Sequence, residues 1–291
     1  MSTLDASVQA PSNQQIARKK KQRVPLRRLV LRSAAFLYLG FLLVIPLVVI
    51  LFDGLREGIG GLWHQVTLPV AWHALKLSLW TALIMTAINT TFGLLTAYVL
   101  VRFEFPGKAV LNAIIDLPLA IPSLVTGVML VVLYGPQQAV GAWLKESLGL
   151  SIIFAPPGII LALLFITYPF VIRAVQPVLA VLDRDQENAA ATLGAPGWMI
   201  FWRIIFPSIR LPLISGALLS FARAVGEFGA IVIVAGNIPL FSQTAAVYVL
   251  GEVESENRMG ASAVSIVMIA IALTATLTAQ ALQRRLAGRK R

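Results

Sequence analysis

The chain has 291 residues, of which 58% are hydrophobic and 13% are charged, and its mean hydropathy is +0.82. Soluble domains carry about 25% charged residues, so this composition excludes an ordinary soluble protein and predicts one integral membrane domain. The absence of cysteine excludes a disulfide framework and a thiolate metal site.

The N-terminal part is polar and then strongly basic, with a basic run that ends at Arg32. An apolar segment over residues 33–52 follows, which is long enough to cross a bilayer. No small-residue cleavage site comes after it, so we predict an uncleaved first helix. We interpret residues 1–32 as a basic cytoplasmic tail that sets the topology, with specific binding of lipid or a partner as the alternative.

Five further apolar segments follow the first one. They cover residues 74–101, 109–134, 157–182, 207–238 and 259–282. Six such segments predict an all-α integral membrane fold with six transmembrane helices over residues 33–283. A second basic tail, also expected in the cytoplasm, occupies residues 284–291. Asp116 lies within the third segment, and we interpret it as a helix-end cap or a snorkelling group.

Basic residues gather on one side of this predicted topology. They occupy both tails, the connection 102–108 and the connection between the fourth and fifth segments. The opposite side holds four basic residues: Arg56, Lys76, Lys145 and Arg258. Cytoplasmic loops carry the excess of Lys and Arg, so both termini and the connection 183–207 are predicted to be cytoplasmic. This asymmetry accounts for most of the net charge of +11, and no nucleic-acid partner is expected.

No pattern for catalysis, metal binding or nucleotide binding is found in the sequence. His64 and His73 fall in one outward connection without a cysteine or carboxylate constellation, so no metal site is predicted. Gly107-Lys108 lacks the upstream glycine and the following Ser or Thr of a phosphate-binding loop. If transport uses ATP, another chain must therefore supply the ATPase.

The connection between the fourth and fifth segments carries the most specific pattern. The alanines 189–191 favour a helix, Gly194 and Gly197 permit a sharp turn, and aromatic residues follow from Trp198 to Trp202. These residues predict a short helix, a turn and an aromatic edge along the membrane surface. One face would be available to a partner, although an ordinary amphipathic connector has the same features.

This stretch resembles the EAA loop of ABC importer permeases, which reads Glu-Ala-Ala, three residues, Gly, nine residues and Ile-x-Leu-Pro. Here Ala189-Ala190, Gly194 and Ile204–Pro207 match that spacing. Two positions depart from it: Asn188 takes the place of the motif Glu, with Glu187 one residue earlier, and Phe206 replaces Leu.

The resemblance implies a coupling helix that docks in a groove of the ATPase subunit. Six residues would then couple to the ATPase: Glu187, Asn188, Ala189, Ala190, Gly194 and Ala195. It further implies a type I ABC importer-like permease fold, in which a cytosolic ATPase dimer uses ATP and Mg²⁺ and this chain binds no cofactor.

Residues 221–230 resemble the fifth-helix motif of sulfate, thiosulfate and molybdate permeases. Other matches to the sulfate group lie at residues 102–108, 116–118, 168–173 and 235–239. The sulfate permease of that family is a heterodimer of T-type and W-type membrane subunits, and this chain has features of both. The resemblance implies a second homologous permease subunit, a periplasmic sulfate-binding protein and membrane lipid as partners.

Arg223 and Glu227 are charged residues within the fifth apolar segment, four apart and hence on one face of a predicted helix. An uncompensated charge there costs about 2.5–3.5 kcal/mol on insertion scales. Either the two form an ion pair that fixes helix packing, or they line the translocation path or a gate. Gly226 and Gly229 beside them would allow close approach between helices.

We therefore predict the permease subunit of an ATP-driven ABC importer in the bacterial inner membrane. It would translocate sulfate or thiosulfate by alternating access and catalyse no bond change itself. Molybdate, tungstate or another oxyanion is the alternative substrate. A passive anion channel is the alternative from another class, and it leaves the loop 183–207 without a role. An intramembrane enzyme would need a second catalytic group near Glu227 or Asp116, and none is evident.

Overall fold

The computed structural model describes residues 26–288, and every regular element in that range is a helix. Residues 1–25 and 289–291, which belong to the two predicted basic tails, lie outside it. The chain divides into one unit that ends at Leu47 and another that begins at Val48.

The first unit is one helical segment. It contains α1 (Leu26–Leu39), the π-helix η1 (Gly40–Val44) and the beginning of α2 (Ile45–Gly54). Helix α1 begins inside the stretch that was predicted to be a tail, which is a difference from the sequence analysis. The segment Ser33–Gly54 has a mean hydropathy of 2.8 over its most apolar window, long and apolar enough to cross a membrane.

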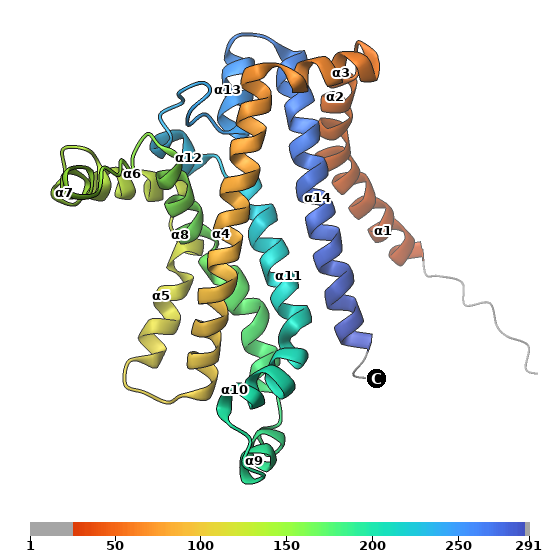
Figure 1. Ribbon diagram of the computed structural model, residues 1–291. Coiled ribbons are helices and arrows are strands. Elements are labelled where there is room, and N and C mark those ends of the chain that lie inside the picture. The colour runs from red at the N-terminus through yellow and green to blue at the C-terminus, as the bar shows by residue number, and fades with distance from the viewer. Residues whose placement is uncertain (1–25, 289–291) are drawn as a thin grey trace, which may run out of the picture. The chain divides into compact units, whose positions relative to one another are not determined.

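The second unit contains four more helices of this kind. They are α4 (Pro69–Arg102), α8 (Pro156–Ala180), the continuous helix from α10 (Gly197–Ile200) through η2 (Phe201–Ile205) to α11 (Phe206–Val225), and α14 (Arg258–Gly288). Helices α4, α8, α11 and α14 run side by side (Figure 1). Since α14 continues to Gly288, the described start of the predicted C-terminal tail is helical.

The third predicted segment is broken. Helices α5 (Lys108–Ala120) and α6 (Ser123–Tyr134) meet at an angle of 109°, and together they make a sixth apolar span if they are taken as one. The break lies at Ile121 and Pro122, because proline lacks an N–H group and forces the residue before it out of the helical region. Ile121 has the expected extended conformation, with φ −82° and ψ 128°.

The fifth predicted segment, residues 207–238, is not one helix. The helix that begins at Gly197 ends at Val225, and the short helix α12 (Gly229–Val234) follows after three non-helical residues. Glycines at positions 226 and 229 weaken the continuity that the apolar composition indicated. The outward connections also differ from prediction, since they contain α3 (Gly58–Thr67), α7 (Ala139–Leu148) and α13 (Ala245–Glu254).

Small and polar residues bring the long helices together. A Cβ at Gly93 of α4 would lie 3.0 Å from the Val171 side chain of α8, so the two helices approach closely there. Asn89 Nδ2 donates to Thr167 Oγ1 at 2.9 Å and to the Leu164 carbonyl at 3.1 Å, and the Asn89 and Thr167 side chains are buried. These bonds satisfy polar groups that would otherwise be costly in an apolar core.

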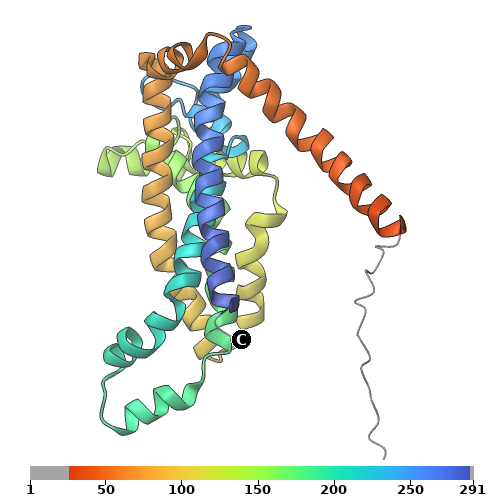
Figure 2. The same ribbon diagram turned by 90° about the vertical axis from the view of Figure 1, so that its right-hand side faces the viewer.

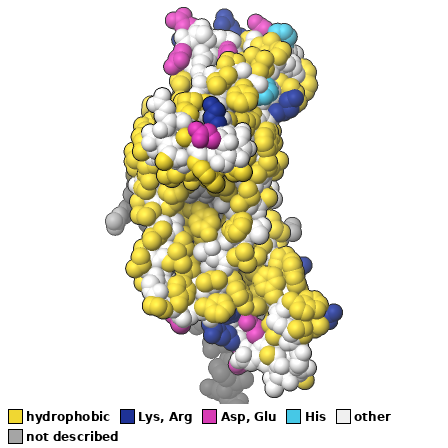
Figure 3. Space-filling view, turned by 60° about the vertical axis from the view of Figure 1, so that its left-hand side comes forward, with side chains coloured by type: hydrophobic (Ala, Val, Ile, Leu, Met, Phe, Trp, Pro, Cys, Tyr) yellow, Lys and Arg dark blue, Asp and Glu magenta, His cyan; other side chains and the backbone are white. Residues whose placement is uncertain are grey.

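The distribution of side chains fits a membrane protein. Hydrophobic side chains cover the middle of the surface seen in Figure 3, and charged side chains gather toward its two ends. The connection that contains α9 (Arg184–Thr192) and α10 lies at the opposite end of the bundle from α3 and α13 (Figures 1 and 2). This places the predicted coupling loop at one end of the spans.

Candidate functional site

The predicted coupling loop begins with a capped helix. Asp183 Oδ1 accepts a hydrogen bond from the Asp185 N–H at 2.9 Å and so satisfies one N–H group at the start of α9. Asp185 and Glu187 lie in the first turn, where negative charge is favourable because it faces the positive end of the helix dipole. The sequence therefore fixes the start of α9 locally.

The glycine of the predicted motif ends α9. Gly194 has φ +83°, and the N–H groups of Gly194 and Ala195 donate to the carbonyls of Ala191 and Ala190 at 2.9 and 3.0 Å. This pair of bonds is a Schellman motif, which favours glycine at the left-handed position. The chain reverses direction there and enters α10 after Pro196.

The predicted coupling residues divide between two faces. Asn188, Ala189 and Gly194 are exposed, whereas Glu187, Ala190 and Ala195 are partly buried. Leu193 is 89% exposed and was missed by the sequence analysis. A large apolar side chain directly before the motif glycine is the signal that could have found it. The exposed face of α9 thus combines small and polar residues with one leucine.

Glu187 faces the bundle and forms an ion pair with Arg102, the last residue of α4. The Arg102 and Glu187 side chains are only 7% and 16% exposed. Arg184 Nη2 also donates to the Val101 carbonyl at 3.2 Å. The sequence analysis included Arg102 only within a family motif, because a partner 85 residues away leaves no local signal.

The part of the connection that follows the turn, α10 and η2, carries an aromatic cluster. Phe201 packs edge-on against Tyr98 of α4 with ring centroids 6.1 Å apart, and against Trp202 at 5.3 Å. Trp202 in turn lies 4.8 Å from Phe206. Trp198 and Trp202 remain exposed, as the predicted aromatic edge requires. Such residues are typical of the boundary between membrane and water.

Glu227 lies beyond the end of α11, so the prediction that Arg223 and Glu227 share one helix face is wrong. They nevertheless form an ion pair, with Arg223 Nη1 2.6 Å from Glu227 Oε2. The Glu227 side chain is 1% exposed and that of Arg223 is 37% exposed. Glu227 Oε1 also accepts from the Ala230 N–H at 3.0 Å, which caps α12. The carboxylate therefore connects α11 to α12.

The two glycines beside this pair have different surroundings. A Cβ at Gly229 would overlap the Ser123 hydroxyl and lie 3.1 Å from the Leu124 nitrogen at the start of α6. A Cβ at Gly226 would meet only backbone oxygens, at 3.8 and 3.9 Å. Close helix approach therefore requires glycine at position 229 and not at position 226.

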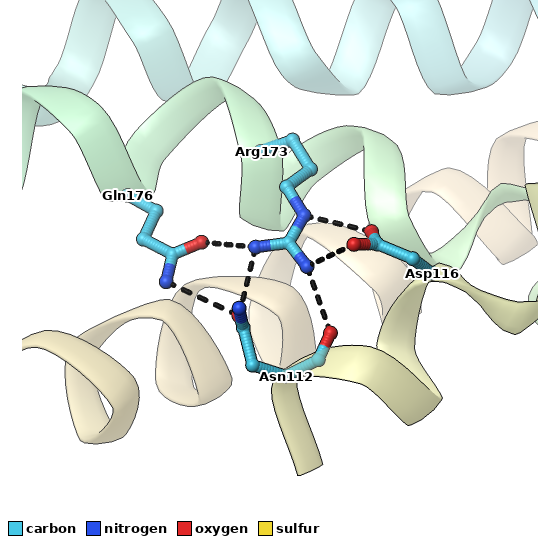
Figure 4. A network of polar contacts seen from close by, with 4 residues as sticks. All are labelled: Asn112, Asp116, Arg173 and Gln176. Carbon is cyan, nitrogen blue, oxygen red and sulfur yellow. Dashed lines mark hydrogen bonds and ion pairs between the residues drawn. The ribbon is translucent and has the colours of Figure 1, made fainter. Parts of the chain in front are cut away.

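A third charged pair joins α5 to α8 (Figure 4). Arg173 donates to Asp116 twice, from Nε to Oδ1 at 2.8 Å and from Nη2 to Oδ2 at 2.6 Å. The remaining N–H groups donate to the side-chain and main-chain oxygens of Asn112 at 2.8 and 2.9 Å and to Gln176 at 2.6 Å. All five guanidinium donors are thus occupied, which leaves none for an anion.

Asp116 has a different role from the one expected. It lies in the interior of α5 and pairs with Arg173 in the bidentate geometry of a strong charge-assisted contact. It is therefore neither a helix-end cap nor a snorkelling group. Sequence analysis noted both residues separately, but the 57 residues between them concealed the pair.

A groove of about 660 Å³ lies between α4, α11 and α14. Each of its threonines donates its hydroxyl to a carbonyl of its own helix: Thr86, Thr90, Thr274 and Thr278. The other lining residues are apolar, so the groove presents no obvious donor to an oxyanion. Over residues 26–288 no group of three His, Cys, Asp or Glu side chains is arranged to hold a metal ion.

Comparison with known proteins agrees with this architecture. A family model described as binding-protein-dependent transport system inner membrane component matches residues 89–291. The probable sulfate transport system permease protein cysT of Chlorokybus atmophyticus is 41% identical over 236 residues, 81% of this chain and 82% of the relative. The sulfate transport system permease protein CysW of Synechocystis sp. is 38% identical over 256 residues, 88% of this chain and 92% of the relative.

The fold has a relative among solved structures. A crystal structure of a bacterial alginate ABC transporter, in complex with an alginate pentasaccharide-bound periplasmic protein, matches with a TM-score of 0.71. The match covers 90% of this chain and 94% of that chain at 16% identity, so it supports the fold alone. The predicted type I importer fold is confirmed, and the chain is a multi-pass permease subunit and not an enzyme. It belongs to the family of binding-protein-dependent transport system inner membrane components.

Proposed function

We propose that this chain is a membrane-spanning subunit of an ATP-driven importer of sulfate and thiosulfate in the bacterial inner membrane. The observation that carries the substrate class is the 41% identity, over 81% of the chain, to a protein named as a sulfate permease. A W-type relative with the same substrate in its name matches at 38% identity. The substrate class is thus supported by relatives of both subunit types.

The energy comes from a cytosolic ATPase dimer that docks on the exposed face of α9. This face holds Asn188, Ala189, Leu193 and Gly194. The ATPase uses ATP and Mg²⁺, and this chain binds neither. ATP binding moves α9, the spans tilt, and the path opens toward the periplasm; hydrolysis resets it.

Arg223 belongs to the translocation path or to its gate. An oxyanion needs N–H donors, and charged donors bind it most strongly. Arg223 is partly exposed while Glu227 holds it from a buried position, so the guanidinium is oriented and its charge is largely balanced. The helix break that positions the pair begins at Gly226, and Gly229 follows it as the first residue of α12. The Arg173 donors, by contrast, are all engaged within the chain.

The remaining partners follow from this assignment. A second homologous permease subunit completes the path, and a periplasmic sulfate-binding protein delivers the substrate on the side of α3, α7 and α13. The excess of Lys and Arg puts both termini and the α9 connection in the cytoplasm. Membrane lipid surrounds the apolar band of the spans.

The test is uptake of radiolabelled sulfate by cells that lack this chain, with and without a plasmid that restores it. Loss of uptake, rescue by the chain and competition by unlabelled thiosulfate are the expected results. Intact sulfate uptake together with lost molybdate uptake would instead assign the chain to molybdate. If neither uptake changes in a strain without a second sulfate system, the oxyanion assignment is wrong.

A further inference from the structure

We propose that Arg102 is a positioning residue for energy coupling, because its ion pair with Glu187 fastens α9 to α4. A movement imposed on α9 would then act directly on α4 as well as on the helices to which α9 is joined by the chain. The inference rests on the proposed function, since it takes α9 as the element that the ATPase moves.

The Arg102–Glu187 pair differs from an ordinary surface ion pair. Both side chains are largely shielded from solvent, and Arg102 Nε is buried without a hydrogen-bond partner. Exposed pairs contribute little, whereas removal of one partner from a shielded pair leaves an uncompensated charge. The pair between Lys108 and Glu104 is the exposed counterpart, with Glu104 87% exposed. These two pairs provide a matched comparison.

Two further contacts join the connection to the same end of α4. Arg184 donates to the Val101 carbonyl, one of the carbonyls that a helix end leaves without an intrahelical partner. Phe201, the first residue of η2, packs against Tyr98, which lies about one helical turn before Arg102 on α4. The end of α4 is thus held by a charge pair, a hydrogen bond and an aromatic contact.

The Arg102–Glu187 ion pair matters because it connects α9 to a helix, α4, that is distant from α9 in the sequence. Helix α9 is joined by short connections to α8 and α10, but Arg102 is 85 residues away from Glu187 in the sequence. Helix α4 has 34 residues and packs against α8 and α11 along the bundle. Contiguous contacts of this kind carry coupling between distant sites. The ion pair therefore adds a third span to those that α9 can move.

The experiment uses the complete importer, reconstituted with its ATPase, binding protein and second permease subunit. Arg102→Ala and Glu187→Gln are each expected to lower sulfate uptake per ATP hydrolysed by about fivefold or more, the lower end of typical coupling between sites. ATPase copurification by Arg102→Ala should stay unchanged. The double variant should be no worse than either single variant, because both remove one interaction. Glu104→Gln should leave the ratio unchanged.

A cross-link separates positioning from a merely structural role. The chain contains no cysteine, so Arg102→Cys with Glu187→Cys can be joined by a short bis(methanethiosulfonate), which forms a disulfide with each thiol, releases two sulfinates and is cleaved by reduction. The cross-link should restore uptake per ATP, and its reduction should remove that gain. A wild-type ratio in Arg102→Ala, or a cross-link that restores nothing, would overturn the proposal.

The same cysteine pair also tests the proposal without any substrate, because the variant lacks the ion pair until the cross-linker is added. Without the ion pair, ATP binding should move α9 relative to α4, so the cross-link should form less readily with ATP than without it. Equal cross-linking in both states would show that α9 and α4 stay together without the ion pair and would overturn the proposal. Absence of sulfate uptake by the wild-type complex would overturn the substrate assignment instead, so the two failures are distinguishable.

Discussion

Gly194 occupies a backbone conformation that other residues reach only at a cost. Its φ of +83° lies in the left-handed region, which costs an L residue with a side chain roughly 1–2 kcal/mol. A Cβ at this position would meet no atom within 4 Å, so crowding within the chain does not explain the glycine. The motif glycine is therefore explained by the turn that it makes.

Gly194→Ala is expected to distort the turn that presents Leu193. Sulfate uptake and ATPase copurification should both fall, and limited proteolysis should cut the connection faster. Gly197→Ala is the matched control, since a Cβ there also meets no atom within 4 Å and its φ is not positive. Equal effects of the two substitutions would contradict the role assigned to the turn.

The burial of Glu227 decides how the role of Arg223 must be tested. Arg223→Ala would leave a buried carboxylate without its cation and would therefore disturb folding as well as transport. Arg223→Lys retains the charge but loses the planar set of donors.

We expect Arg223→Lys to lower sulfate uptake severalfold while thermal unfolding of the purified complex changes little. Arg203→Lys, at an exposed arginine on η2, should alter neither. A lowered unfolding temperature with normal uptake per folded complex would assign the Arg223–Glu227 pair to packing alone.

At the scale of elements, the crossing of α12 over the start of α6 depends on one glycine. Gly229→Ala should force α12 away from Ser123 and reduce the unfolding temperature and the yield of assembled complex, because the added Cβ would also crowd the Leu124 backbone nitrogen. Gly226→Ala should be tolerated, as its nearest neighbours lie 3.8 Å away or farther. Assembly is measured by size-exclusion chromatography in detergent. Normal assembly of both variants would show that the contact between α12 and α6 does not require glycine at position 229.

The exposed face of α9 makes a prediction about docking. Leu193→Asp should abolish ATPase copurification without reducing membrane insertion, since a charge would replace the large apolar side chain of that face. Leu148→Asp changes another exposed leucine, on helix α7 in a connection predicted to face outward, and should leave copurification intact. Normal binding of the ATPase by Leu193→Asp would remove Leu193 from the docking site.

The sequence predicted the existence of the spans better than it predicted where the helices end. Apolar runs predicted the spans well, because a helix in lipid must satisfy its backbone internally and present apolar side chains over about 20 residues. The same criterion joined residues 207–238 into one span, although the chain leaves the helix after Val225. Hydropathy averaged over a long window misses such a break, because the three residues 226–228 weigh little against the apolar residues on both sides.

At the scale of the whole molecule, charge sets a testable orientation. Since the chain has no cysteine, single cysteines can report it. In intact cells a membrane-impermeant maleimide should label Lys145→Cys on the outward side and should label Leu193→Cys only after permeabilisation. Both residues are exposed in this chain, and the labelling is done in cells without the ATPase, so that docking does not cover Leu193→Cys. The reverse labelling pattern would invert the proposed topology.

The sequence by itself determined the class of this protein, its apolar spans and the place of the loop 183–207 with its glycine turn, because these depend on composition and on residues close together in the chain. The tertiary structure decided which charges meet. Arg102 pairs with Glu187 across 85 residues and Arg173 with Asp116 across 57 residues, and Glu227 caps α12 only because α11 has ended. Such contacts depend on how helices pack and where they stop, and neither property is encoded in a local pattern.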